Sequence, residues 1–103
     1  MEHFIDNELL DSMAGNVVEY LEFLRKDSLS CGIYKLKAGA DDPQKPHDED
    51  EIYYVLEGTA SFTSGSDTVA LSKGSILFVA AEEVHRFHDI KEDLTLLVFF
   101  AAN

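Results

Sequence analysis

Residues 46–58 read PHDEDEIYYVLEG, in which His47 and Glu51 lie four positions apart and precede a dense run of β-branched and aromatic residues. On a helix this spacing would place the two side chains on one face. The run at residues 52–55 has poor helix propensity, however, and Pro46 lies just upstream, so the helical interpretation fails. The stretch instead predicts a bend between two extended segments. His47 ends the first segment, Glu51 begins the second, and both side chains point inward.

A third side chain of the same chemical kind lies further along the chain, at His85, where another predicted strand begins. Strand alternation places Phe87 on the same side as His85 and sends His88 to the opposite face. Two imidazoles and one carboxylate on three faces of an ion form the arrangement used for non-haem Fe(II), and the same set suits Mn, Ni, Co or Zn. His47, Glu51 and His85 are therefore candidate ligands of one divalent metal ion, whose identity the ligands alone do not select. On these residues alone, coincidence is the other interpretation of a His–Glu pair and one distant histidine.

Strand signals dominate the sequence outside this stretch, with short turns between them. Eight short strands at spacings of about 8–12 residues indicate an all-β sandwich or barrel, and a double-sheet jelly roll suits so short a chain. One short helix at most, over residues 7–13, precedes them. Several strands are apolar on both faces, which predicts a second layer or a partner subunit, so we expect a homodimer. The predicted strands are residues 16–24, 29–36, 52–56, 59–63, 68–71, 76–79, 84–89 and 94–100.

The composition of the 103-residue chain, 46% of it hydrophobic, suits a single domain over residues 1–103. A formal net charge of −12 would repel nucleic acid and anionic membranes, so we expect neither as a partner. The longest nearly apolar run, residues 94–102, is about half of a membrane span, and residues 1–10 lack the basic region of a signal peptide. We expect a cytoplasmic protein. Cys31, the only cysteine, excludes an internal disulfide and predicts a small core residue.

Two spaced motifs connect the chain to a known family. The first has the spacing Gly-x5-His-x-His-x3–4-Glu-x6-Gly, and the chain follows it at Gly39, His47, Glu51 and Gly58, with Lys45 where the first histidine is usual. The second has the spacing Gly-x5-Pro-x-Gly-x2-His-x3-Asn. The chain matches its glycine and histidine at Gly74 and His85, and replaces its proline, second glycine and asparagine with Ala80, Glu82 and Asp89. In both motifs the chain resembles the cupin superfamily, and the short gap between the motifs is similar to that of small bacterial cupins.

The resemblance implies a double-stranded β-helix, or jelly-roll barrel of the RmlC-like kind, around a metal that is usually held by three histidines and one glutamate. Because Lys45 replaces the first histidine, three protein ligands remain, His47, Glu51 and His85, and water would fill the other positions. Gln44 is an alternative oxygen ligand, and loss of the metal is a further alternative. Lys45 itself would turn to solvent, or lose its proton and act as a base or amine nucleophile.

The resemblance also implies a metal-dependent enzyme that acts on a small organic molecule by a dioxygenase-, isomerase- or lyase-type reaction. A non-catalytic binding or sensing protein, or an accessory protein in biosynthesis, is the alternative. A metal-free isomerase that uses Lys45, Tyr53 or His85 as acid and base is a third reading. Four aromatic side chains would supply the walls of a substrate pocket if they face inward, although each also suits an ordinary core: Tyr34, Tyr53, Phe62 and Phe87.

Overall fold

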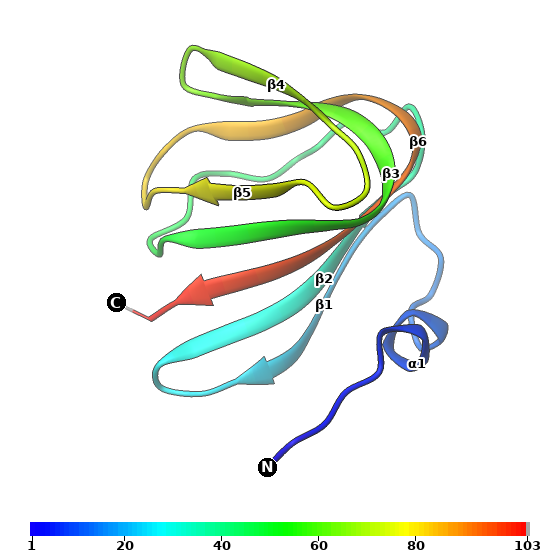
Figure 1. The fold of residues 1–103 in the computed structure, drawn as a ribbon, viewed down its shortest axis with the longest axis vertical. Helices are drawn as coiled ribbons and strands as arrows, with labels where there is room; N and C mark the ends of the chain where they lie inside the picture. Colours follow the sequence, from blue (N-terminus) through cyan, green and yellow to red (C-terminus); the bar gives the residue numbers. More distant parts are fainter. Residues whose placement is uncertain (103) are drawn as a thin grey trace.

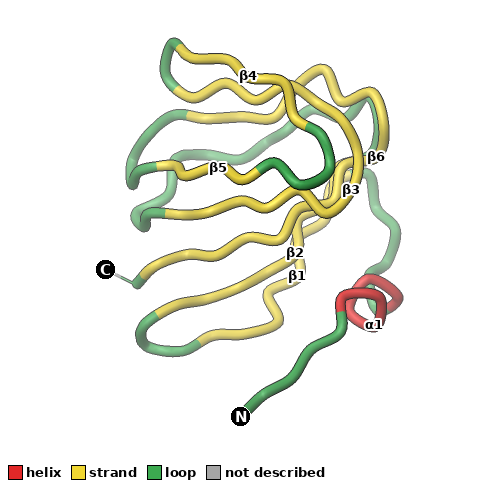
Figure 2. The backbone as a smooth tube through the Cα atoms, in the orientation of Figure 1, coloured by secondary structure: helices red, strands yellow, loops and turns green. Residues whose placement is uncertain are grey.

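The computed structural model describes residues 1–102, which form one antiparallel sheet and one short helix (Figures 1 and 2). The strand order is β1-β2-β6-β3-β4, and β5 pairs with β3. The all-β jelly-roll prediction is confirmed. The predicted short helix is also present, and none of its residues is buried. The elements are α1 (Asp6–Asp11), β1 (Val18–Arg25), β2 (Leu29–Leu36), β3 (Glu51–Ser64), β4 (Asp67–Leu71), β5 (Ile76–Val79) and β6 (His85–Ala101).

The two longest strands, β3 and β6, pair along their whole lengths and bend together (Figure 1). Their register shifts three times between Val55 and Ser61, and such irregularities bend a strand and increase its twist. Gly58 lies within this region with a φ of +98°, and a Cβ atom there would lie 2.3 Å from the backbone oxygen of Asp93. Only glycine permits so close an approach of the two strands.

The prediction that strands end near Gly58 and in a turn at residues 91–93 is wrong. β3 and β6 each continue through these positions, because Glu57 pairs with Thr95 and Thr59 pairs with Glu92. Glycine and a run of charged residues mark a bend here instead of an end. Two predicted pairs of strands therefore merge, and the eight predicted strands become six.

The bend folds the sheet back on itself, so that its two halves face one another. His85 pairs with Ser64, thirteen residues along β3 from Glu51, which would be about 43 Å away in a straight strand. In the structure, Nε2 of His85 and Oε1 of Glu51 are 3.0 Å apart. The hydrophobic core fills the space between the two halves and consists mainly of Tyr34, Leu36, Tyr53, Val55, Ala60, Phe62, Leu71, Val79, Phe87, Ile90, Leu94, Leu96 and Val98.

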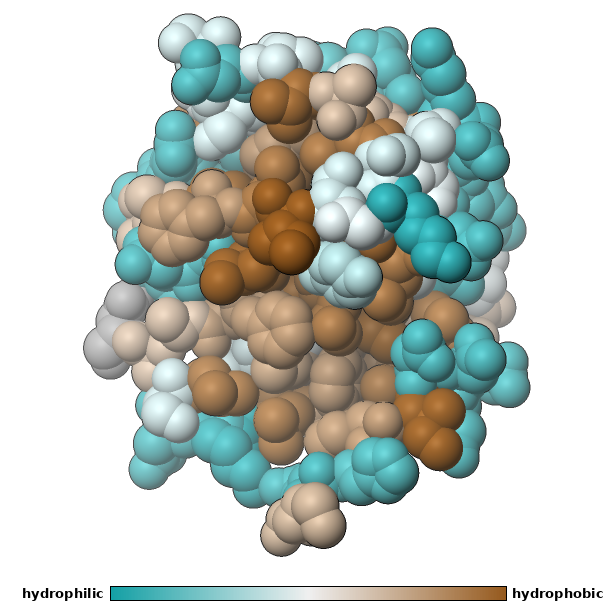
Figure 3. Space-filling view, viewed as in Figure 1, coloured by the Kyte–Doolittle hydropathy of each residue, from teal (hydrophilic) through white to brown (hydrophobic). Residues whose placement is uncertain are grey.

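The outer face of β5, β3 and β6 is apolar and uncovered. Side chains alternate along β3, so that Glu51, Tyr53 and Val55 are buried inside while Ile52 and Tyr54 lie outside. Apolar side chains gather in the middle of the face seen in Figure 3. The exposed large residues of these three strands are Ile52, Tyr54, Ile76, Phe78 and Phe99.

Part of the neighbouring sheet surface is covered by the N-terminal segment. The ring of Phe4 packs edge-on against Phe23 of β1, at a centroid distance of 4.9 Å. Ile5 and Leu9 lie beside Ile33 of β2 at the same place. Within residues 1–102, no helix has the length and apolar character needed to cross a membrane.

Candidate metal centre

Three side chains from separate parts of the chain converge inside the sheet. His47 lies in the loop between β2 and β3, Glu51 begins β3, and His85 begins β6. One ligand atom from each lies within 4.8 Å of the others. Glu51 and His85 are buried and His47 is half-buried. The group could therefore hold one metal ion, with an approach from the side of His47.

The hydrogen bonds of His85 determine which of its ring nitrogens faces this group. Nδ1 lies 2.8 Å from the carbonyl oxygen of Glu83, which can only accept, so Nδ1 carries a hydrogen. Nε2 of the neutral ring then carries a lone pair, and it lies 3.0 Å from Oε1 of Glu51. Burial lowers the pKa of His85, but the Glu51 carboxylate and the Glu83 carbonyl more than offset burial and raise that pKa above its usual value. The surroundings thus favour a positive charge at Nε2, either a proton or a metal ion.

The second carboxylate oxygen of Glu51 supports the same conclusion. Oε2 is buried and has no hydrogen-bond partner among the described residues. A buried acceptor without a partner costs about 1–3 kcal/mol, and more when it belongs to a charged group. A divalent cation between Glu51, His85 and His47 would satisfy this oxygen and both imidazole lone pairs, so the residues present fit such an ion.

Two further polar groups lie beside the three. The amide oxygen of Gln44 is 3.1 Å from Nε2 of His85 and 3.3 Å from Nε2 of His47. The hydroxyl of Tyr53 donates to this oxygen at 2.9 Å and lies 3.2 Å from Nε2 of His85. Burial, together with the neighbouring Glu51 carboxylate, raises the pKa of Tyr53, so its phenol stays protonated. Lys45 is exposed and lines no part of the pocket described next.

A pocket of about 450 Å³ opens beside the group and is lined by His47 and Gln44. Tyr34 and Tyr53, two of the expected wall residues, line it, together with Tyr20 and Phe100, whose contribution the sequence did not suggest.

The other two expected wall residues do not line this pocket. Phe62 and Phe87 are 4% and 0% exposed, and they pack against each other and against Tyr53 deeper in the barrel. Phe87 lies on the same side of its strand as His85, as strand alternation predicts, but alternation does not give the depth of a side chain. They support the rings of Tyr53 and His85 from behind, with centroid distances of 5.0 Å from Phe87 to Tyr53 and 5.9 Å from Phe62 to His85.

The charged side chains that line the pocket are mostly acidic. Glu19, Glu22 and Glu49 contribute carboxylates, and Arg25 is the only cation among the lining residues. Arg25 is already engaged, because its Nη2 lies 2.6 Å from Oε1 of Glu22. The pocket therefore offers no free cationic group to an anionic ligand.

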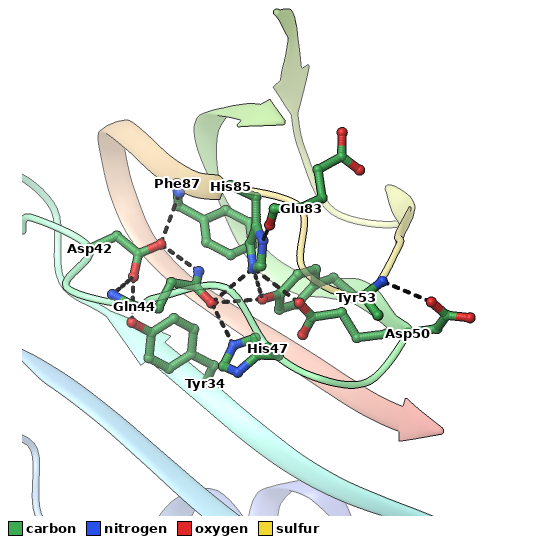
Figure 4. Close-up of polar contacts among 11 residues, drawn as sticks. Tyr34, Asp42, Gln44, His47, Asp50, Tyr53, Glu83, His85 and Phe87 are labelled. Atoms are coloured by element: carbon green, nitrogen blue, oxygen red, sulfur yellow. Dashed lines mark hydrogen bonds and ion pairs between the residues drawn. The ribbon is translucent and has the colours of Figure 1, made fainter. Parts of the chain in front are cut away.

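Asp42 is the residue of this region that the sequence reasoning missed. Its carboxylate accepts hydrogen bonds from the hydroxyl of Tyr34 at 2.6 Å, from the backbone N–H of Phe87 at 2.9 Å, and from the side-chain amide of Gln44 (Figure 4). An acidic residue in a proline-containing loop carries no periodic signal that predicts such contacts. His88, by contrast, lies away from the group, bonded to Thr63 and to Asp89.

Comparison with known proteins gives consistent matches. A curated relative, an uncharacterized protein of Streptomyces coelicolor, is 45% identical over 101 residues and covers 98% of this chain and 96% of its own length. The solved structure of KdgF from a Halomonas species superimposes with a TM-score of 0.82 at 19% identity, covering 99% of this chain and 95% of that one. The DMSP lyase DddQ from Ruegeria pomeroyi superimposes with a TM-score of 0.79 at 20% identity, over 89% of this chain and 52% of that one.

At these identities the two solved structures show the fold alone. The family is shown by a more direct match, because residues 32–100 fit the sequence model of the cupin domain. That range contains the three converging side chains and all strands from β3 to β5. The chain therefore belongs to the cupin domain family.

Proposed function

We propose that this protein is a metal-dependent enzyme that acts on a small organic molecule, in a lyase or isomerase type of reaction. The observation that carries the proposal is that ligand atoms of His47, Glu51 and His85 lie within 4.8 Å of one another, with Oε2 of Glu51 buried and unpaired among the described residues. Such a set is costly without a cation at its centre.

The three side chains would be the metal ligands. Their number leaves coordination positions free on the side of the pocket, so that a bound metal would polarise a substrate oxygen as a Lewis acid. Glu83 fixes the ring of His85 through its carbonyl, in the way that an outer hydrogen bond commonly orients a ligand histidine.

Tyr53 is the group best placed to handle a proton beside the centre. Its hydroxyl lies 3.2 Å from Nε2 of His85 and donates a hydrogen bond to Oε1 of Gln44 at 2.9 Å. It would donate a hydrogen bond, or a proton, to a substrate atom held there. A protic group in this position favours proton-transfer chemistry, as in lyases and isomerases. Lys45 takes no part, because its side chain is exposed.

The lining of the pocket limits the substrate class. Aromatic rings of Tyr20, Tyr34 and Phe100 would cover an apolar or planar part of the substrate and exclude water. The carboxylates at the pocket disfavour a substrate of high negative charge, since Arg25 is already paired with Glu22. We expect a small neutral or positively charged molecule with one oxygen able to reach the metal.

A homodimer is the proposed assembly. The outward positions of β5 and β3, at Ile52, Tyr54, Ile76 and Phe78, carry no charge and form one apolar face. Two copies with a net charge of −12 each would repel one another on most approaches. Contact between the uncharged faces of two copies avoids this repulsion. Because both copies use the same surface, the result is a closed, two-fold symmetric dimer.

The metal is tested on protein that has been stripped with a chelator and dialysed against Mn, Fe(II), Co, Ni or Zn. Elemental analysis should find one equivalent per chain in the wild type and less than about a tenth in His85→Ala. His88→Ala is the matched control, because His88 lies on the same strand and its hydrogen bonds go to residues outside the group. This variant should keep the metal. Added metal should raise the melting temperature. The expected gain in the free energy of unfolding is about 2.7 kcal/mol when the free metal concentration is a hundred times Kd. A wild type that binds none of the five ions would overturn the proposal.

Turnover is tested next on the loaded protein. Small neutral and cationic molecules that raise its melting temperature are followed by NMR for conversion. Conversion that disappears in His85→Ala and falls in Tyr53→Phe supports the enzyme. Ligands that bind but remain unchanged would instead indicate a binding or sensing protein.

A further inference from the structure

We infer that Gln44 supplies a fourth protein ligand through its amide oxygen, and that Asp42 is the positioning residue that aims this oxygen at the metal. The inference rests on the metal site proposed above and specifies its composition. It gives a site of two nitrogen and two oxygen donors, in which an amide oxygen takes the place of the usual first histidine.

The amide oxygen of Gln44 lies from both imidazoles at about the distance expected between two ligands of one ion. Two donors about 2.1 Å from one ion lie about 3.0 Å apart at an octahedral angle and about 3.4 Å apart at a tetrahedral angle. Oε1 of Gln44 lies 3.1 Å from Nε2 of His85 and 3.3 Å from Nε2 of His47. Oε1 of Glu51 lies 3.0 Å from the same atom of His85. All three separations fall in or near this interval.

Asp42 determines which end of the amide faces the group. The amide nitrogen of Gln44 lies 2.5 Å from Oδ2 of Asp42. Rotating the amide by half a turn would bring two acceptor oxygens together and would aim the N–H group at the imidazoles. The hydrogen bond to Asp42 therefore selects the orientation in which the oxygen points at His47 and His85 (Figure 4).

Asp42 is itself held firmly enough to do this. Its Oδ1 accepts from the hydroxyl of Tyr34 at 2.6 Å and from the backbone N–H of Gln44 at 3.2 Å. Its Oδ2 accepts from the backbone N–H of Phe87, at 2.9 Å, two residues beyond the ligand His85 on β6. The carboxylate thus ties the loop that carries Gln44 to the strand that carries His85.

The loop also explains why residue 44 faces inward where the motif would use residue 45. In an extended segment, residues 45 and 47 would share a side. No strand lies between Leu36 and Glu51, so this alternation does not apply in the loop. Gln44 and His47 both reach the group, while Lys45 is exposed. An uncharged donor replaces an uncharged imidazole, so the total ligand charge is unchanged.

The donor set has a consequence for metal choice. An amide oxygen is a harder donor than an imidazole, and oxygen ligands suit Mn²⁺ better than they suit Zn²⁺ or Ni²⁺. Removing Gln44 should therefore weaken Mn²⁺ binding more than Zn²⁺ binding, and it should alter the visible spectrum of bound Co²⁺.

The experiment titrates the metal-free, full-length chain with Mn²⁺, Zn²⁺ and Co²⁺ and measures Kd by calorimetry and the Co²⁺ absorption spectrum. We expect Gln44→Ala to weaken Mn²⁺ binding about 10–100-fold and to change the Co²⁺ spectrum. Asp42→Asn should weaken Mn²⁺ binding about tenfold. Lys45→Ala, the neighbouring residue with an exposed side chain, is the control and should match the wild type. Gln44→Met keeps the length of the side chain without its amide oxygen, and it should lose more affinity for Mn²⁺ than for Zn²⁺, a change in selectivity that a purely structural role for Gln44 would not produce.

The outcomes separate this inference from the proposed function. If Gln44→Ala binds Mn²⁺ like the wild type with an unchanged Co²⁺ spectrum, while His85→Ala loses the metal, Gln44 is not a ligand and the three-residue site stands. If Gln44→Ala does not fold, Gln44→Met decides, because wild-type Mn²⁺ affinity with an unchanged Co²⁺ spectrum in that folded variant also overturns the inference. A wild type without metal removes both proposals.

Discussion

The two faces of β3 differ completely in what they carry, although they are built from alternate residues of one short stretch. The inner face presents Glu51 and Tyr53 to the polar group, and Val55 to the core beyond it. The outer face presents Ile52 and Tyr54 to solvent as part of an apolar surface. In the proposed function, the inner face serves the metal site and the outer face serves dimerisation. Substitutions on one face should then leave the function of the other intact.

The largest effect is expected on the inner face. Glu51→Gln removes the negative charge but keeps the size of the side chain, and it should weaken metal binding by at least about a hundredfold, since even outer-shell changes cost 10–100-fold. Glu57→Gln, at an exposed glutamate of the same strand, should bind metal like the wild type. Calorimetric titration measures both. Equal affinities in the two variants would remove Glu51 from the ligand set.

The second largest effect is expected at the bend of β3 at Gly58. Ala at Gly58 must adopt a φ of +98°, which costs about 1–3 kcal/mol, and its Cβ must also avoid the Asp93 carbonyl. Gly74 has a similar φ of +92° but open space around it, so Gly74→Ala measures the conformational cost alone. Urea unfolding should show a greater loss for Gly58→Ala than for Gly74→Ala. Equal losses would mean that the close approach of β3 and β6 is unimportant.

The smallest effect is expected on the outer face. Phe78 is 66% exposed, so Phe78→Glu should cost little fold stability but should weaken a dimer about tenfold or more by placing charge in an apolar interface. Val17→Glu, at a residue 58% exposed just before β1, is the control. Sedimentation analysis should detect dissociation in Phe78→Glu only, with metal binding unchanged. A wild type that is monomeric at all concentrations would contradict the assignment of this face.

Much of this organisation could be predicted from the sequence, because both sources of prediction were local. The bend expected between His47 and Glu51 turned both of these side chains inward, and the motif spacings connected them with His85, which lies beside them in the structure. What failed was long-range or irregular. A glycine after a run of strand residues usually marks the end of the strand. Here β3 continues through Gly58, because the residues on either side of it pair with β6, and the strand bends instead. Alternation placed Phe87 on the side of His85, but it could not predict that Phe87 and Phe62 lie behind the pocket.

The loop before β3 was the least predictable part. Side chains in this loop do not alternate between two sides as they do in a strand. Gln44 could therefore be predicted only as an alternative oxygen ligand, and Lys45 as a residue that turns to solvent or acts as a base or nucleophile. The contacts of Gln44 depend on Asp42, whose partners are Tyr34 on β2 and Phe87 on β6. Those partners are eight and forty-five residues away from Asp42. The closed sheet brings these residues together, so no local sequence pattern could predict their hydrogen bonds.

The pairing of β3 with β6 also has a consequence for how the site comes into existence. Glu51 pairs with Phe100, and Ser64 pairs with His85, so these contacts connect distant parts of the chain and form slowly compared with local structure. The carboxylate of Glu51 meets the imidazole of His85 only after both ends of this hairpin-like pair have closed. A bound cation would then add little to the rate of folding and act mainly by delaying unfolding, so that it extends the lifetime of the finished molecule.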